Sequence, residues 1–162
     1  MKIIHDGDGW LNRKTTPEIY EAYKEYMKTG DYPYTAKVTD WIADKYGVAE
    51  EDKKQLGHEV YLAADMYRVE EMIALEQELL GKGFTPITKF ELKEGEKIIL
   101  QGCDEPLRLS KDELGWFGFP PKHTRRGVRL EDKIRDHQAY EKAKEDGRTH
   151  MQGEAVRMVK AI

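Results

Sequence analysis

The chain has 162 residues, of which 36% are charged and 39% hydrophobic, and its formal net charge is −4. This length suffices for one domain that buries roughly two-thirds of the surface of the unfolded chain, so we predict a single domain over residues 1–162. The sequence contains no run of 18 apolar residues and no signal-peptide core, which disfavours membrane insertion and export. The single Cys103 agrees with a reducing, cytoplasmic location.

The charges are distributed unevenly along the chain. Residues 122–162 hold 11 Lys and Arg against 7 Asp and Glu, whereas residues 1–121 hold 16 against 24. We therefore predict an acidic body with a basic C-terminal extension over residues 122–162. An acidic body repels phosphates and attracts basic protein surfaces, which disfavours broad, non-specific binding to DNA.

Two short helices are predicted before residue 50. Thr16 followed by Pro17 is typical of a helix start, and Gly30 indicates the end of that helix. Its apolar stripe is aromatic, and we interpret it as core packing instead of a base-stacking platform because acidic residues interleave with it. The residues of this stripe are Ile19, Tyr20, Tyr23, Tyr26 and Met27. A second helix is predicted over 36–46, and Gly47 stops it.

The segment 50–80 predicts one long helix around which the rest of the chain is arranged. One apolar stripe follows helical spacing through its whole length, and a second seam occupies its first half. This pattern predicts a central helix whose first half is buried on two sides. The two sets are Leu62, Met66, Val69, Ile73 and Leu80, and Leu56, Val60, Ala63 and Tyr67.

The segment 42–56 resembles a helix-turn-helix, with Ala43 at the helix crossing and Gly47 in the turn. The resemblance implies DNA binding through the second helix. Two features depart from it: Lys53 occupies an inward position, and three acidic residues at 50–52 open the second helix, where they would face phosphates. We therefore favour a structural helical corner and keep a nucleic-acid-binding regulator as the alternative function.

A small antiparallel sheet is predicted over about 85–110, with strands at 87–92, 97–101 and 106–109, because hydrophobic and polar residues alternate there. Together with the helices this predicts an α+β fold with a mainly helical body.

Chemical motifs are weak throughout the chain. Glu91 and Lys93 match only the second half of a metal-dependent nuclease motif. His5 and His58 have no histidine at ligand spacing. Asp6 and Asp8 lack the closing glutamate of a calcium loop. We predict no metal, no cofactor and no catalytic residue, and keep a metal-dependent nuclease or hydrolase as the third hypothesis.

The stretch 114–129 shows neither helical nor strand periodicity and combines large aromatic residues with several cations. We predict an exposed loop that binds a partner, because aromatic and arginine side chains dominate binding hot spots. The alternative is that the rings close the end of the core and the arginines pair with the protein's own acids. The candidate binding residues are Trp116, Phe117, Phe119, Lys122, Arg125, Arg126 and Arg129.

Two C-terminal helices are predicted. Residues 130–145 form a charged helix with a thin apolar stripe. Thr149 and Gln152 form a capping box for a last helix that reaches Ile162. That last helix would dock on the central helix or pair with a second copy to form a homodimer.

These observations lead to a functional hypothesis. We expect a non-enzymatic, cytoplasmic interaction protein that binds another macromolecule, most simply a protein, with nucleic acid as an alternative through the basic segment 122–135 and no membrane partner. The acidic, motif-poor chain is compatible with an inhibitor from a phage or mobile element that blocks a host nucleic-acid enzyme, as anti-CRISPR proteins do.

Overall fold

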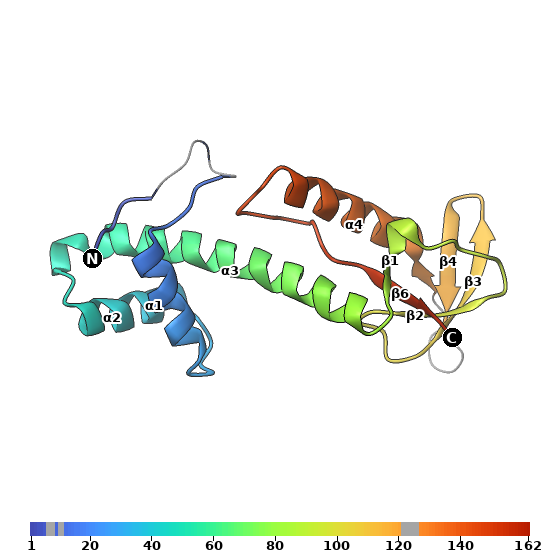
Figure 1. The fold of residues 1–162 in the computed structure, drawn as a ribbon, viewed down its shortest axis with the longest axis horizontal. Helices are drawn as coiled ribbons and strands as arrows, with labels where there is room; N and C mark the ends of the chain where they lie inside the picture. Colours follow the sequence, from blue (N-terminus) through green and yellow to red (C-terminus); the bar gives the residue numbers. More distant parts are fainter. Residues whose placement is uncertain (6–8, 10–11, 121–126) are drawn as a thin grey trace. The chain divides into compact units, whose positions relative to one another are not determined.

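The computed structural model describes residues 1–5, 9, 12–120 and 127–162. Over these residues the fold is α+β, as predicted, with four α-helices and a six-stranded sheet (Figure 1). The chain divides into two compact units, which we describe separately. Unit 1 comprises residues 1–71 and 147–151, and unit 2 comprises residues 72–146 and 152–162. The single domain and its basic extension stay predictions.

Unit 1 is built from α1 (Pro17–Met27), α2 (Thr35–Tyr46), the 3-10 turn η1 (Glu50–Asp52) and the first part of α3 (Lys53–Gly81). The predicted caps are confirmed: the Thr16 hydroxyl accepts the Ile19 N–H, and Gly47 ends α2 at a φ of 68°. A left-handed φ is accessible to glycine at little cost, which explains this helix end.

The core of unit 1 forms where α1, α2 and the first half of α3 meet. The aromatic stripe of α1 is buried there, which confirms its interpretation as packing, and the second seam of α3 is buried as predicted. The Tyr26 ring stands edge-on to Trp41 with centroids 5.5 Å apart, an arrangement favoured by the ring quadrupoles. The fully or nearly fully buried residues are Ile19, Tyr20, Ala22, Tyr23, Tyr26, Val38, Ile42, Ala43, Leu56, Val60 and Ala63.

Unit 2 contains the sheet, the end of α3 and the helix α4 (Leu130–Glu145), which was predicted with these bounds. All strand pairs are antiparallel, and the order across the sheet is β1-β6-β2-β3-β4-β5. The strands are β1 (Thr85–Pro86), β2 (Lys97–Leu100), β3 (Leu107–Asp112), β4 (Gly115–Phe119), β5 (Val128–Arg129) and β6 (Met158–Ala161).

Alternation along these strands separates two faces of the sheet. The inner face packs against α4 and the 3-10 turn η2 (Ile87–Lys89), where Leu130 and Ile134 join the core (Figure 1). Leu107 and Leu109 of β3 are each 1% exposed on this face. The inner-face residues are Ile98, Leu100, Leu107, Leu109, Trp116, Gly118, Val128 and Val159.

Two sequence predictions in unit 2 are wrong. The segment 87–92 is not a strand: it begins with η2, and the Ile87 N–H bonds the Arg157 carbonyl at 3.0 Å instead of a strand ladder. The stretch 114–129 is not a single loop, because β4 pairs with β3 over its whole length and β5 pairs with β4. Trp116 and Phe117 are adjacent and glycines flank them, so the sequence shows no alternation of apolar and polar residues.

The predicted last helix is also wrong. Gly153 has a φ of 84°, which interrupts a right-handed helix. The residues beyond it form β6, which inserts between β1 and β2. The helical spacing of apolar residues there was a coincidence of a short segment, and the homodimer predicted through that helix loses the element that suggested it. Among the described residues, no helix combines the length and the apolar character that crossing a membrane requires.

Candidate functional site

Opposite the covered side, the sheet presents an outer face that carries both aromatic rings and cations. Strand register places Lys97 of β2, Arg108 of β3 and Phe119 of β4 in one row across the sheet, and all three are exposed. Ile162, which follows β6 and is 69% exposed, extends this row beyond Lys97. On strands β2 to β6 the outer face includes Lys97, Ile99, Arg108, Ser110, Asp112, Phe117, Phe119, Arg129 and Lys160, followed by Ile162.

The alternation of β4 explains why neighbouring aromatic residues have different surroundings. Trp116 points to the inner face and packs on the core, with the Lys111 ammonium 5.3 Å from its ring centroid. Gly118 lies on the same side, where a Cβ would meet the Leu107 Cβ at 2.8 Å. A larger residue at 118 would therefore push β4 away from β3. Phe117 and Phe119 consequently point to the outer face.

The two phenylalanine rings form an edge-to-face pair. Their centroids are 4.9 Å apart and their planes lie at 87°. Phe119 is 41% exposed and Phe117 is half-buried. The Arg129 guanidinium carbon lies 5.2 Å from the Phe117 centroid, within the range of a cation–π contact. The pair therefore exposes mainly the Phe119 ring.

Arg129 is held by the protein's own carboxylate. Its two terminal nitrogens donate to the two Asp112 carboxylate oxygens at 2.8 and 2.9 Å. These hydrogen bonds lower the pKa of Asp112 to about 2, with further help from the backbone N–H of Leu114. This bidentate pair fixes Arg129 over Phe117 and thereby supports the ring pair. Because both terminal nitrogens bond Asp112, Arg129 cannot make a second bidentate contact with a partner.

Lys97 and Arg108 of the outer face differ from Arg129 because no carboxylate of the described residues holds them. Among the described residues, neither Lys97 nor Arg108 has an ion-pair partner. Both line a hollow of about 460 Å³. The wall of this hollow is otherwise apolar, with Pro106, Phe119, Pro120 and Ile162. The hollow thus offers positive charge beside apolar surface, an arrangement suited to an anionic group attached to an apolar or aromatic one.

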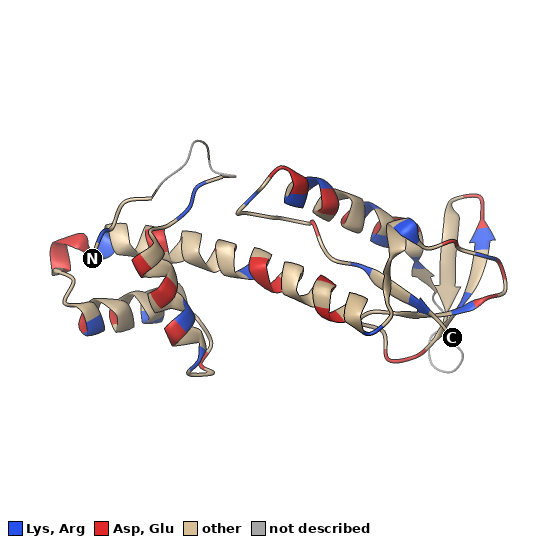
Figure 2. Ribbon diagram, viewed as in Figure 1, with Lys and Arg blue, Asp and Glu red and all other residues tan. Residues whose placement is uncertain are grey.

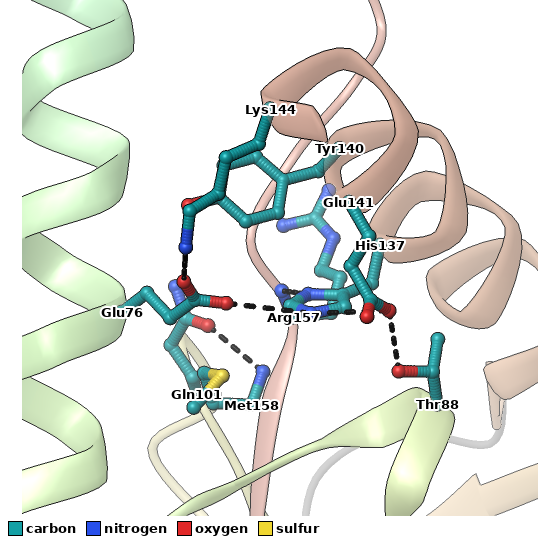
Figure 3. A network of polar contacts seen from close by, with 9 residues as sticks. All are labelled: Glu76, Thr88, Gln101, His137, Tyr140, Glu141, Lys144, Arg157 and Met158. Atoms are coloured by element: carbon teal, nitrogen blue, oxygen red, sulfur yellow. Dashed lines mark hydrogen bonds and ion pairs between the residues drawn. The ribbon is translucent and has the colours of Figure 1, made fainter. Parts of the chain in front are cut away.

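A second polar cluster lies in the interior of unit 2 around His137 (Figure 3). The His137 side chain is fully buried, and its Nδ1 accepts the Arg157 backbone N–H at 2.8 Å. Its Nε2 lies 3.7 Å from the Glu76 carboxylate and 3.6 Å from that of Glu141. Lys144 and Tyr140 donate to Glu76 at 2.8 and 3.3 Å. This cluster joins α3, α4 and the C-terminal segment.

The hydrogen bond at Nδ1 determines what His137 can do. Because Nδ1 accepts a hydrogen bond from the Arg157 backbone N–H, the single proton of the neutral ring resides on Nε2, facing the two carboxylates. Burial lowers the pKa of His137, although Glu141 and Glu76 oppose this effect. An Nε2 that carries a proton has no lone pair for a metal ion. The cluster is therefore a structural network that lies beside a cavity of about 670 Å³ lined by Glu76, Glu141 and Lys144.

The other sequence candidates do not converge on one site. His5 contacts the buried Glu59 at 3.0 Å, whereas His150 contacts Asp65 at 2.7 Å. His58 is exposed and lines a separate hollow of about 330 Å³. Within the part of the chain that the structure describes, no group of three or more His, Cys, Asp or Glu residues could hold a metal ion.

The helical corner of unit 1 provides little surface for reading DNA. Lys53 is engaged by Asp40 at 3.5 Å and by Glu50 at 3.1 Å. The η1 turn consists of three exposed acidic residues (Figure 2). These acids stand where a recognition helix would meet phosphates, and the buried Leu56 and Ile42 serve packing.

Of the seven candidate residues predicted from the sequence, the structure brings Phe117, Phe119 and Arg129 together on the outer face and places Trp116 on the inner face. Lys122, Arg125 and Arg126 lie outside the described residues. Sequence reasoning missed Lys97, Arg108 and Ile162. The alternation of Leu and polar residues over 107–110 could have indicated Arg108, whereas Ile162 required knowledge of β6.

Comparison with known protein families, with curated proteins and with solved structures finds no match for this chain.

Proposed function

We propose that this protein is a non-catalytic binding protein that holds another macromolecule on the outer face of unit 2. The supporting observation is Phe119, a ring that is 41% exposed in the same row as Lys97 and Arg108, two cations without an ion-pair partner in the described part of the chain. Burial of an exposed ring against a partner removes apolar surface from water, and the neighbouring cations supply electrostatic complementarity to an anionic partner.

The organisation of the rings also supports binding. Phe117, Arg129 and Asp112 form a connected set of contacts beneath and beside Phe119. A ring held in one orientation loses little conformational freedom when a partner covers it, so more of the contact energy appears as affinity.

The second polar region of unit 2 supports a protein without catalysis of its own. The His137 ring nitrogens face the Arg157 N–H and two carboxylates of the same unit, and Glu76 is engaged by Lys144 and Tyr140. A general base needs a lone pair directed at substrate, whereas the Nδ1 lone pair of His137 accepts the Arg157 N–H and the buried Nε2 carries the ring proton. The narrower role of a phage-type inhibitor stays a prediction.

The test is affinity capture from the native host with matched variants. Phe119→Ala and Arg108→Gln are each compared with the wild type and with Leu114→Ala, which removes another exposed apolar residue from the turn between β3 and β4. The wild type and Leu114→Ala should retain the same partner, and both outer-face variants should lose it. Parallel captures with nuclease treatment separate protein from nucleic-acid partners.

Retention of that partner by both outer-face variants would show that the outer face is not the binding surface. The thermal unfolding midpoint of each variant provides the control for folding. We expect midpoints close to that of the wild type, because these side chains contribute little to the core.

A further inference from the structure

Resting on the proposed function, we infer that the outer face binds single-stranded nucleic acid, with a base stacked on Phe119 and backbone phosphates at Arg108 and Lys97. Three features of the outer face carry this inference: the presentation of the ring, the placement of the cations and the closure of the start of β4 to an added strand.

Phe119 is presented as a stacking platform. The Phe117 and Phe119 rings are nearly perpendicular with centroids 4.9 Å apart, and Phe119 remains 41% exposed. The backbone at Gly127 flanks both rings: a Cβ there would lie 3.2 Å from Phe119 and 3.3 Å from Phe117. A base has a flat π surface whatever its identity, so a fixed ring on an antiparallel sheet binds unpaired bases with little sequence preference.

The cations stand where the backbone of a stacked strand would run. Arg108 and Lys97 follow Phe119 across the sheet at one and two strand spacings, each about 4.8 Å. Their long side chains reach phosphates beside a base stacked on the ring, and a guanidinium can bind two phosphate oxygens at once. On the described strands β2, β3 and β4, the outer-face carboxylate is Asp112, whose charge is balanced by Arg129.

The start of β4, beside the edge strand β5, is closed to an added peptide strand. The Trp116 N–H at the start of β4 donates to the Glu131 carboxylate at 2.9 Å, and a Cβ at Gly115 would collide with that same side chain. An acidic peptide therefore cannot extend the sheet at this position by main-chain hydrogen bonds. An acidic peptide would have to bind across the face through its side chains alone. A carboxylate side chain cannot stack on the Phe119 ring, whereas a base can, so the peptide gains less contact energy there.

Charge balance favours a single strand over a duplex. Unit 2 holds 16 Lys and Arg against 16 Asp and Glu, so its net charge attracts no phosphate backbone. Affinity must then come from stacking together with two local cations. A duplex keeps the faces of its bases inside the helix, whereas a single strand can place them on Phe119.

The experiment measures fluorescence anisotropy with the full-length protein and three labelled probes. The probes are an oligothymidylate of about twelve nucleotides, which lies within the ~4–16 nucleotides that such surfaces cover, the same oligonucleotide in a duplex, and an oligoglutamate peptide of equal length. We expect the single strand to bind most tightly and its affinity to fall with added salt.

Matched variants identify the surface responsible. Phe119→Leu keeps apolar bulk without a π surface and should weaken single-strand binding about tenfold, whereas Phe119→Tyr should keep it. Arg108→Gln should weaken binding and reduce the slope of log affinity against log salt by ~0.7. Lys111→Gln removes a cation from the same strand but from the opposite face, so it should bind like the wild type.

Each alternative result has a distinct meaning. Absence of single-strand binding, or equal binding by Phe119→Leu, Arg108→Gln and the wild type, overturns the inference. Binding of the oligoglutamate peptide that depends on Phe119 and Arg108, without binding of the single strand, overturns the inference and leaves the proposed function standing. Failure of every probe, together with capture of partners by the outer-face variants, overturns both.

Discussion

The two faces of the β3–β4 pair place the same kinds of side chain in opposite environments. Leu107 and Trp116 lie on the inner face and pack against the core of unit 2, whereas Arg108 and Phe117 lie on the outer face. Leu107 and Arg108 are adjacent in the sequence, and so are Trp116 and Phe117. The comparison shows that an aromatic residue contributes to stability or to a binding surface according to its position in the strand alternation, and not according to its type.

Polar groups show the same contrast. On the covered side, His137 and Glu76 are buried, and burial lowers the pKa of the imidazole. On the outer face, Asp112 is exposed, and its hydrogen bonds to Arg129 lower its pKa to about 2. The buried groups link α3 to α4, so their loss should change stability, whereas the exposed pair orients a ring and should contribute mainly to binding.

The largest effect should come from a pair of substitutions on β3. Leu107→Ala removes a side chain that is 1% exposed and should lower the free energy of unfolding by about 2–5 kcal/mol, through lost apolar contact and the cavity left behind. Arg108→Ala, one residue away, should lower it by less than about 0.5 kcal/mol. Urea denaturation measures both. Similar losses for the two variants would contradict the assignment of faces.

A smaller effect should follow from filling the inner face. Gly118→Ala introduces a Cβ 2.8 Å from the Leu107 Cβ, so β4 must shift, and we expect a loss of about 1–3 kcal/mol in the free energy of unfolding. Gly95→Ala is unsuitable as a control because Gly95 has a φ of 84°. Gly81→Ala suits this purpose, since a Cβ there meets no atom within 4 Å. An unchanged stability for Gly118→Ala would show that β3 and β4 are further apart.

The buried histidine predicts a dependence of stability on pH. The imidazole of the unfolded chain has a pKa near 6.5, whereas folded His137 has a lower pKa. Below pH 6.5 the unfolded chain therefore binds more protons at this residue than the folded chain does, which favours unfolding. The stabilising contribution is complete above pH 6.5 and is lost as the pH falls toward the folded pKa. We expect the free energy of unfolding to fall between pH 6.5 and 5.5, by no more than the ~1.4 kcal/mol that one pH unit is worth for a single proton.

The matched variant for this measurement is His137→Gln, which keeps an acceptor for the Arg157 N–H and a donor toward the carboxylates. Its unfolding free energy, determined in urea at several pH values, should fall less steeply than that of the wild type in this range. Parallel pH profiles for the two proteins would show that His137 titrates as it does in the unfolded chain.

The smallest effect on stability should accompany the largest effect on binding. Phe119→Ala should lower the thermal midpoint by only a few degrees, because the side chain is already 41% exposed and loses mainly its contact with Phe117. A drop as large as that of Leu107→Ala would place Phe119 in the core and remove the basis for a binding surface. Differential scanning calorimetry, run beside Leu114→Ala, provides this measurement.

Much of the fold could be predicted because helix signals are local. Pro17 and Gly47 mark helix ends through the φ angles that their own backbones adopt, and the central helix follows from apolar spacing within one segment. Of the candidate site, Phe117, Phe119 and Arg129 could be selected by residue type. The sequence could not predict that Trp116 lies on the opposite face from Phe117 and Phe119, because residue type alone does not indicate which face of a strand an aromatic residue occupies.

The sequence by itself determined the helices α1 to α4, although it also predicted a last helix that is strand β6, and it determined the presence of a cluster of rings and cations between residues 114 and 129. Only the tertiary structure decided that β6 enters the sheet beside β2, that Lys97, Arg108 and Phe119 share one row, and that Arg129 is held by Asp112. The physical reason is the range of the interactions. Helical hydrogen bonds join residues four positions apart, whereas the pairing of β2 with β6 joins residues about sixty positions apart and depends on the packing of all of unit 2.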